Sequence, residues 1–108
     1  MSFNVKSISV FERQTKRLIK KYPSLKKEIQ KLIKELKEGP EKGTSIGHNC
    51  YKLRLAIASK GKGKSGGARV TTHLIFKDDT VYMLSIYDKS EIATLTNKEI
   101  LELIQLIP

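Results

Sequence analysis

Six cationic side chains lie between positions 52 and 69, in a stretch that contains no acidic residue. This stretch, from Tyr51 to Arg69, reads YKLRLAIASKGKGKSGGAR. Its cations are Lys52, Arg54, Lys60, Lys62, Lys64 and Arg69. Arginine binds phosphate oxygens through a planar pair of hydrogen bonds, whereas lysine acts as a mobile point charge. A cluster of both types without a neutralising carboxylate indicates a site for phosphate.

The spacing of these cations is suited to RNA cleavage without a metal. On a strand, Lys52 and Arg54 share a face, about 6–7 Å apart along the backbone. Hairpin pairing would bring Arg69 near Arg54. Together they could bind a backbone phosphate and stabilise the charge that builds on it when the adjacent 2′-OH attacks. A base and an acid are also needed. The candidates are a lysine whose pKa is lowered by its cationic neighbours and His73, on the same face.

The Gly/Lys segment of residues 59–67 has two interpretations. It is either a flexible solvated hairpin loop or an element that binds nucleic acid through Lys60, Lys62 and Lys64. A nucleotide-binding P-loop is excluded, because Ala58 stands where that motif needs glycine and because a strand, not a helix, follows. The lysines of residues 12–42 alternate with glutamates on helical spacings, which favours an ordinary solvated helix face.

Hydrophobic periodicity predicts the elements that must position the cations. Period 3.6 predicts helices at residues 9–22 and 24–39 and a short last helix ending near 107; period 2 predicts strands at 51–58, 68–76 and 81–87, with a weaker one at 3–7. Capping boxes are expected at Ser9 with Glu12 and at Thr96 with Glu99. We therefore expect one α+β domain over residues 1–108. An N-terminal helical hairpin would pack on a three- to four-stranded antiparallel sheet, with a short C-terminal helix.

The predicted sheet has one apolar and one basic face. The helical hairpin would cover the side chains of Leu53, Leu55, Val70 and Leu74. The opposite face, called the basic face from here on, would present Lys52, Arg54, Arg69, Thr71 and His73.

Charge and composition restrict the function classes. The net charge of +10 is distributed as +7 over residues 1–43, +7 over 44–77 and −4 over 78–108, which favours a nucleic acid or an acidic protein as partner.

Cys50 is the one cysteine, so an internal disulfide is excluded, and a buried packing role is favoured over a reactive thiol. His48 and His73 with Cys50 lack the count and spacing of a metal site, and no cofactor is expected. Without a signal peptide or an apolar run near 18 residues, we expect a cytoplasmic protein without a membrane segment.

Two segments resemble the RelE superfamily of bacterial toxins, in particular its HigB-like branch. They are KLRLAIASKGKGKSGGARV and LSIYDKSEIATLTNKEI, and the resemblance spans about residues 9–105. It implies the toxin of a toxin–antitoxin pair, an endoribonuclease that cuts mRNA in the A site of the 30S subunit of the ribosome without metal or cofactor. By position, Arg54 and Arg69 would hold the scissile phosphate. Lys52, Lys64 and Lys89 would be the candidates for proton transfer.

The resemblance does not identify the tyrosine that some family members use in the final segment, and two alternative functions remain. Some members use a tyrosine in the final segment, where this chain has Ile-Ala-Thr-Leu at residues 92–95. Tyr87 could substitute or could serve core packing. The implied partner is a cognate antitoxin, a small DNA-binding protein that covers or distorts the basic face. The alternatives are a ParE-like gyrase inhibitor, disfavoured by the phosphate cluster, and a non-catalytic RNA-binding module, disfavoured by an aromatic content of only 6%.

Overall fold

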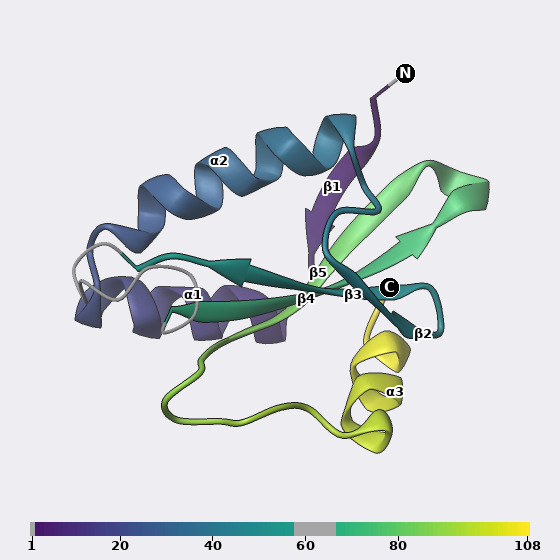
Figure 1. Cartoon of the computed structure of the whole chain (residues 1–108). Helices are drawn as coiled ribbons and strands as arrows, with labels where there is room; N and C mark the ends of the chain where they lie inside the picture. Colours follow the sequence, from purple (N-terminus) through teal and green to yellow (C-terminus); the bar gives the residue numbers. More distant parts are fainter. Residues whose placement is uncertain (1, 58–66) are drawn as a thin grey trace.

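The computed structural model describes residues 2–57 and 67–108, which form a sheet with two helices on one side and a third helix on the other (Figure 1). In chain order the elements are β1 (Asn4–Ser7), α1 (Ser9–Lys21), α2 (Leu25–Glu38), β2 (Thr44–Gly47), β3 (Cys50–Leu55), β4 (Ala68–Ile75), β5 (Thr80–Asp88) and α3 (Asn97–Gln105). The predicted α+β class is confirmed. Lys60, Lys62 and Lys64 lie outside the described residues. Within the described ranges, no helix is long and apolar enough to cross a membrane.

The sheet has the strand order β1-β5-β4-β3-β2. Strands β2 to β5 pair antiparallel, as expected, whereas β1 pairs parallel to β5 from Asn4↔Thr80 to Ser7↔Met83. The sheet is therefore mixed and contains five strands where three or four were expected. The additional strand, β2, has only four residues and is mostly exposed, so it leaves almost no period-2 signal in the sequence.

The two predicted capping boxes have different outcomes. At α3 the box is confirmed: the Thr96 hydroxyl accepts from the Glu99 amide at 3.1 Å, and the Glu99 carboxylate accepts from the Thr96 amide at 2.9 Å. At α1 the box is wrong, because Ile8 occupies the N-cap and Ser9 is already helical. Ile8 is 3% exposed and its amide donates to Met83 O, so the pairing and burial that continue from β1 fix the helix start. The Glu12 carboxylate instead accepts from the Ser7 hydroxyl at 2.8 Å.

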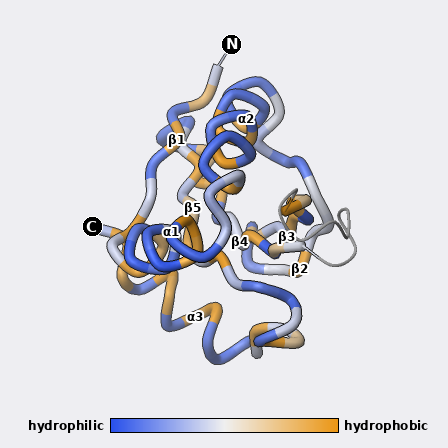
Figure 2. Tube along the Cα trace, turned by 90° about the vertical axis from the view of Figure 1, so that its left-hand side faces the viewer, coloured by the Kyte–Doolittle hydropathy of each residue, from blue (hydrophilic) through white to orange (hydrophobic). Residues whose placement is uncertain are grey.

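Helices α1 and α2 supply an apolar layer against one face of the sheet. Along both helices hydrophilic and hydrophobic residues alternate with the helical turn (Figure 2). Their fully buried side chains include Leu18, Leu25, Leu32 and Leu36. On the facing strands Leu53, Leu55, Val70 and Leu74 are all buried, which confirms the predicted apolar face.

Helix α3 packs against the opposite side of the sheet, where the basic face was expected to be open. The residues that line the space between them include Lys52 and Thr71 from the sheet and Asn97 and Ile100 from α3. Thr71, which also lines this space, is only 1% exposed, and Arg69 on the same face is only 4% exposed. The sequence did not place α3, because its short apolar stripe fits either face of a sheet equally well.

We predict that Gly67→Ala lowers the free energy of unfolding by about 1–3 kcal/mol, because overpacking at a fixed backbone forces the structure to shift. A Cβ at Gly67 would overlap the carbonyl oxygen of Leu55 where β3 and β4 begin to pair. Urea denaturation measures the change. The matched control is Gly39→Ala, whose Cβ would meet Glu35 O at 3.7 Å, so a change within about 0.5 kcal/mol is expected. Equal effects of the two substitutions would contradict this account.

Candidate nucleic-acid interface

Two rows of side chains cross the basic face from β3 to β5. In the first row Arg54 is opposite Arg69, and Arg69 is opposite Tyr87. In the second row Lys52 is opposite Thr71, and Thr71 is opposite Ser85. Directly opposed residues in antiparallel strands have Cβ atoms about 4.5–5.5 Å apart. The three residues Lys52, Arg54 and Arg69, predicted from sequence to form the site, are thus immediate neighbours on one face.

The opposition of Arg54 and Arg69 is electrostatically unfavourable in the isolated protein. Like charges directly opposite each other destabilise a sheet. Arg54 is exposed and forms no ion pair with any residue that the structure describes, whereas Arg69 is buried and donates to the carbonyl of Ala68 at 3.2 Å. An anion bound between the two guanidinium groups would relieve their repulsion. The pair therefore places two cationic residues directly opposite each other on one face, as a phosphate site requires.

Tyr87 ends the first row and is the site residue whose role the sequence left open. It is 2% exposed, and its hydroxyl is buried without a hydrogen-bond partner in the described structure. Burial raises the pKa of this hydroxyl; the Thr94 side chain lies near it without the geometry of a hydrogen bond, and Thr94 and the charge of Arg69 offset the effect of burial only in part. Tyr87 is therefore a neutral phenol at pH 7, with a proton available to donate.

Tyr87 is one of the residues that line a cavity of about 160 Å³. Its polar lining comes from both sides of the gap between sheet and α3: Lys52, Thr71, Tyr87, Thr94 and Asn97. Sequence reasoning missed Thr94 and Asn97 as neighbours of the basic face. The alternation of the strands was sufficient to find Thr71, but residues beyond the last strand join the site only through the packing of α3.

Lys89 extends the same face beyond the end of β5. Its amide donates to Gly67 O at 3.1 Å, which continues the register that pairs Arg69 with Tyr87. Alternation along the strand then puts Lys89 on the side of Tyr87, and its side chain is exposed. The predicted contributor Lys64 and the predicted RNA-binding residues Lys60 and Lys62 are outside the described residues, so their place relative to this face stays a prediction.

His73 lies farther along β4 and is half-buried against Cys50. Its Nδ1 lies 3.4 Å from Cys50 Sγ. Burial lowers the pKa of His73 and the charge of His48 lowers it further, while a backbone hydrogen bond with His48 opposes them. His73 therefore adds no charge to the basic face at pH 7.

Burial raises the pKa of Cys50 to about 11, which fits a packing role for this thiol. In the described ranges, no three His, Cys, Asp or Glu side chains gather as metal ligands.

The fold is found among solved structures of a bacterial toxin. No family model matches the chain. The structure of a double arginine-to-alanine mutant of the E. coli toxin RelE in the free state is similar with a TM-score of 0.62 and 19% identity over 100% of both chains. The structure of the isolated E. coli RelE toxin is similar with a TM-score of 0.63 and 16% identity, over 98% of this chain and 100% of that one. The chain therefore has the fold of the RelE toxin.

Proposed function

We propose that this chain is the toxin of a toxin–antitoxin pair, of the HigB-like branch of the RelE superfamily, and that it cleaves mRNA in the ribosomal A site. The observation that carries the proposal is the row in which Arg54, Arg69 and Tyr87 are directly opposed on one face. The resemblance of the two sequence segments and the fold shared with the E. coli toxin RelE support it.

The proposed reaction is an internal attack within the RNA. The 2′-oxygen bonds to the adjacent phosphorus and the bond from phosphorus to the 5′-oxygen breaks, which yields a 2′,3′-cyclic phosphate and a free 5′-OH. Negative charge increases on the non-bridging oxygens in the transition state. Arg54 and Arg69 would bind those oxygens from neighbouring strands, through donors that the sheet holds in place.

The two proton transfers are assigned to the groups around the arginine pair. Tyr87 is a phenol at neutral pH, so it would act as a hydrogen-bond donor to a phosphoryl oxygen or to the 2′-OH rather than as a base. Lys52, half-buried beside Thr71, and Lys89, beyond Tyr87, would exchange the protons of the 2′-OH and of the leaving oxygen. Lys64 remains a further candidate from the segment outside the described residues.

The proposed dependence on the ribosome follows from the lack of exposed tyrosine rings on the basic face. Proteins that hold single-stranded RNA by themselves stack its bases on aromatic side chains. Tyr87 and Tyr82, the tyrosines that β5 places on this face, are at most 9% exposed and unavailable for stacking. The face therefore supplies charge to one phosphate but little to align a strand. In the proposal the ribosome holds the codon, and an antitoxin, a small DNA-binding protein, restrains the toxin in the cytoplasm.

We predict that Arg54→Ala lowers the rate of mRNA cleavage on ribosomes at least about a hundredfold and abolishes growth arrest, because it removes a charged donor to the transition state. Arg54 is exposed, so the fold should persist. Primer extension on programmed ribosomes maps and quantifies the cuts. Arg13→Ala, which removes an exposed arginine from α1, is the matched control and should retain cleavage.

The same assay separates the alternatives. Cleavage by the Arg54→Ala variant at the unaltered rate would overturn the phosphate assignment. Intact mRNA in cells that express the unaltered chain, together with changed DNA supercoiling, would replace the proposal with the gyrase-inhibitor alternative. Binding of ribosomes or RNA without any cut would favour the non-catalytic module.

We predict that Tyr87→Phe slows cleavage at least about tenfold but leaves the free energy of unfolding unchanged or raises it by up to about 2 kcal/mol. The substitution removes a buried hydroxyl that no described residue binds. Chemical denaturation and the cleavage assay are run on the same preparation. Thr72→Val is the control: the Thr72 hydroxyl is also buried and has no partner in residues 2–57 and 67–108, but Thr72 lies on the helix-covered face. It should stabilise the protein without slowing cleavage. Full activity of Tyr87→Phe would contradict a catalytic role.

A further inference from the structure

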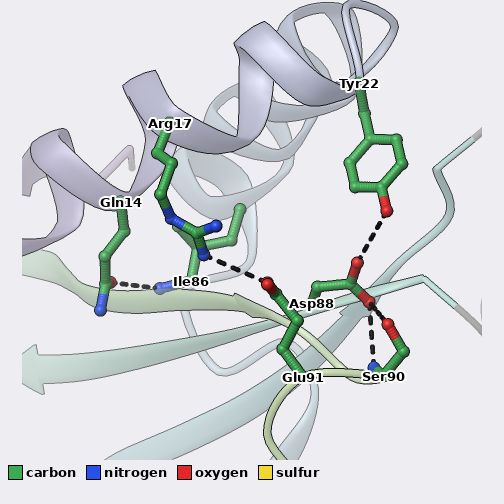
Figure 3. Close-up of polar contacts among 7 residues, drawn as sticks. All are labelled: Gln14, Arg17, Tyr22, Ile86, Asp88, Ser90 and Glu91. Carbon is green, nitrogen blue, oxygen red and sulfur yellow. Dashed lines mark hydrogen bonds and ion pairs between the residues drawn. The ribbon is translucent and has the colours of Figure 1, made fainter.

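The end of β5 carries a buried carboxylate that is bound by helix α1. Asp88 is fully buried, and its Oδ2 accepts from the hydroxyl of Tyr22, the C-cap residue of α1, at 3.0 Å. Its Oδ1 accepts from the amide and the hydroxyl of Ser90, at 3.0 and 2.8 Å. Figure 3 shows the Tyr22 ring extending from the helix toward this carboxylate. A buried carboxylate needs such donors, because an unpaired charge is strongly unfavourable away from water.

A second carboxylate of the same turn is also bound by α1. Glu91 forms an ion pair with Arg17 at 3.1 Å, and Gln14 accepts from the amide of Ile86 at 3.0 Å (Figure 3). The pairing of β1 with β5 ends at Met83, so none of the described strands lies beside the outer edge of β5 beyond that point. Side chains of α1 take the place of the missing strand. We call the contacts Tyr22–Asp88 and Arg17–Glu91 the carboxylate clasp.

The clasp lies on the side of the sheet opposite the proposed site. Strand alternation puts Asp88 on the α1 side and its neighbours Tyr87 and Lys89 on the basic face. The turn after Asp88 is tight, since the amides of Glu91 and Ile92 both donate to Asp88 O, at 2.9 and 3.2 Å. Lys89 is thus flanked by two carboxylates of its own turn, and α1 binds both of them.

We propose that helix α1 positions the Lys89 turn for catalysis through the carboxylate clasp, which holds Asp88 and Glu91 away from the phosphate site and Lys89 beside Arg69. This role rests on the proposed RNase function. A carboxylate that swung onto the basic face would repel the substrate phosphate and neutralise Lys89. Tyr22 and Arg17 are positioning residues: they act on the site only through the turn that they hold.

The first test is Tyr22→Phe, which removes the hydroxyl that binds Asp88 and keeps the ring. We predict that cleavage on ribosomes falls between about ten- and a hundredfold, the usual result of misplacing a reacting group by about an ångström. Amide hydrogen exchange at Ser90, Glu91 and Ile92 should become at least about tenfold faster, with Val70 in the core unchanged. Tyr51→Phe removes a hydroxyl from the helix-covered side of β3 and should change neither quantity.

The second test uses charge removal as a rescue. Arg17→Ala frees Glu91 and should slow cleavage; adding Glu91→Gln should restore most of the rate, because the freed side chain no longer carries charge. Glu91 is exposed, so folding is not at risk. Adding Asp88→Asn to Tyr22→Phe tests the buried carboxylate in the same way, with circular dichroism to check the fold. A purely structural contact would make both double variants as slow as the single ones or slower.

The outcomes separate this role from the proposed function. If the unaltered chain and Tyr22→Phe cleave equally fast, or if the Arg17→Ala, Glu91→Gln double variant is not rescued, the clasp is overturned as a positioning device and the RNase stands. If the unaltered chain cuts no mRNA on ribosomes, the proposed function fails and the catalytic role of the clasp fails with it. Faster exchange in Tyr22→Phe would then report a purely structural contact.

Discussion

The pairing register of β3, β4 and β5 is the constraint on which the rest of this structure depends. On the helix-covered face, Leu53, Val70 and Ile86 are directly opposed and at most 3% exposed. A slip of one residue would turn every side chain of a strand to the other face, so burial of this apolar row excludes other registers. Arg54, Arg69 and Tyr87 each lie one position along their strand from a residue of this apolar row, and their side chains therefore point to the opposite face. Hydrophobic burial on one side thus fixes the arginine pair on the other.

The candidate site contains two features that lower the stability of the folded protein. Two arginines face each other across β3 and β4, and a buried phenol at the end of their row has no hydrogen-bond partner among the residues that the structure describes. Each feature is unfavourable for the folded state, and the core must offset both. A phosphate whose negative charge increases toward the transition state would interact favourably with both arginines and with the phenol hydroxyl. The same two features that weaken the isolated fold are therefore the ones that support a catalytic interpretation.

The two helical layers have different relations to the basic face. Helix α1 lies along β5 and binds Asp88, at the end of the strand, and Glu91, in the turn that follows it. Helix α3 and the segment before it lie over the face itself and form one wall of the cavity at Tyr87. The sheet supplies the arginines, α1 binds the carboxylates of the turn after β5, and α3 lies beside Thr71 and Tyr87. Arg54 is left exposed while Arg69, its opposed neighbour, is buried.

The sequence alone determined the helical pair, the three long strands, the apolar face and the grouping of Lys52, Arg54 and Arg69, because these follow from periodicity and from the two-residue repeat of a strand. It also located the capping box of α3. Tertiary structure decided what local patterns cannot encode: the short strand β2, the parallel pairing of β1 with β5, the start of α1 at Ile8, the side on which α3 packs, and the neighbourhood of Tyr87. Each of these depends on contacts between segments far apart in the chain. The same holds for Asp88, whose hydrogen-bond partner Tyr22 lies 66 positions away; no spacing rule links two such residues until the fold brings α1 against the end of β5.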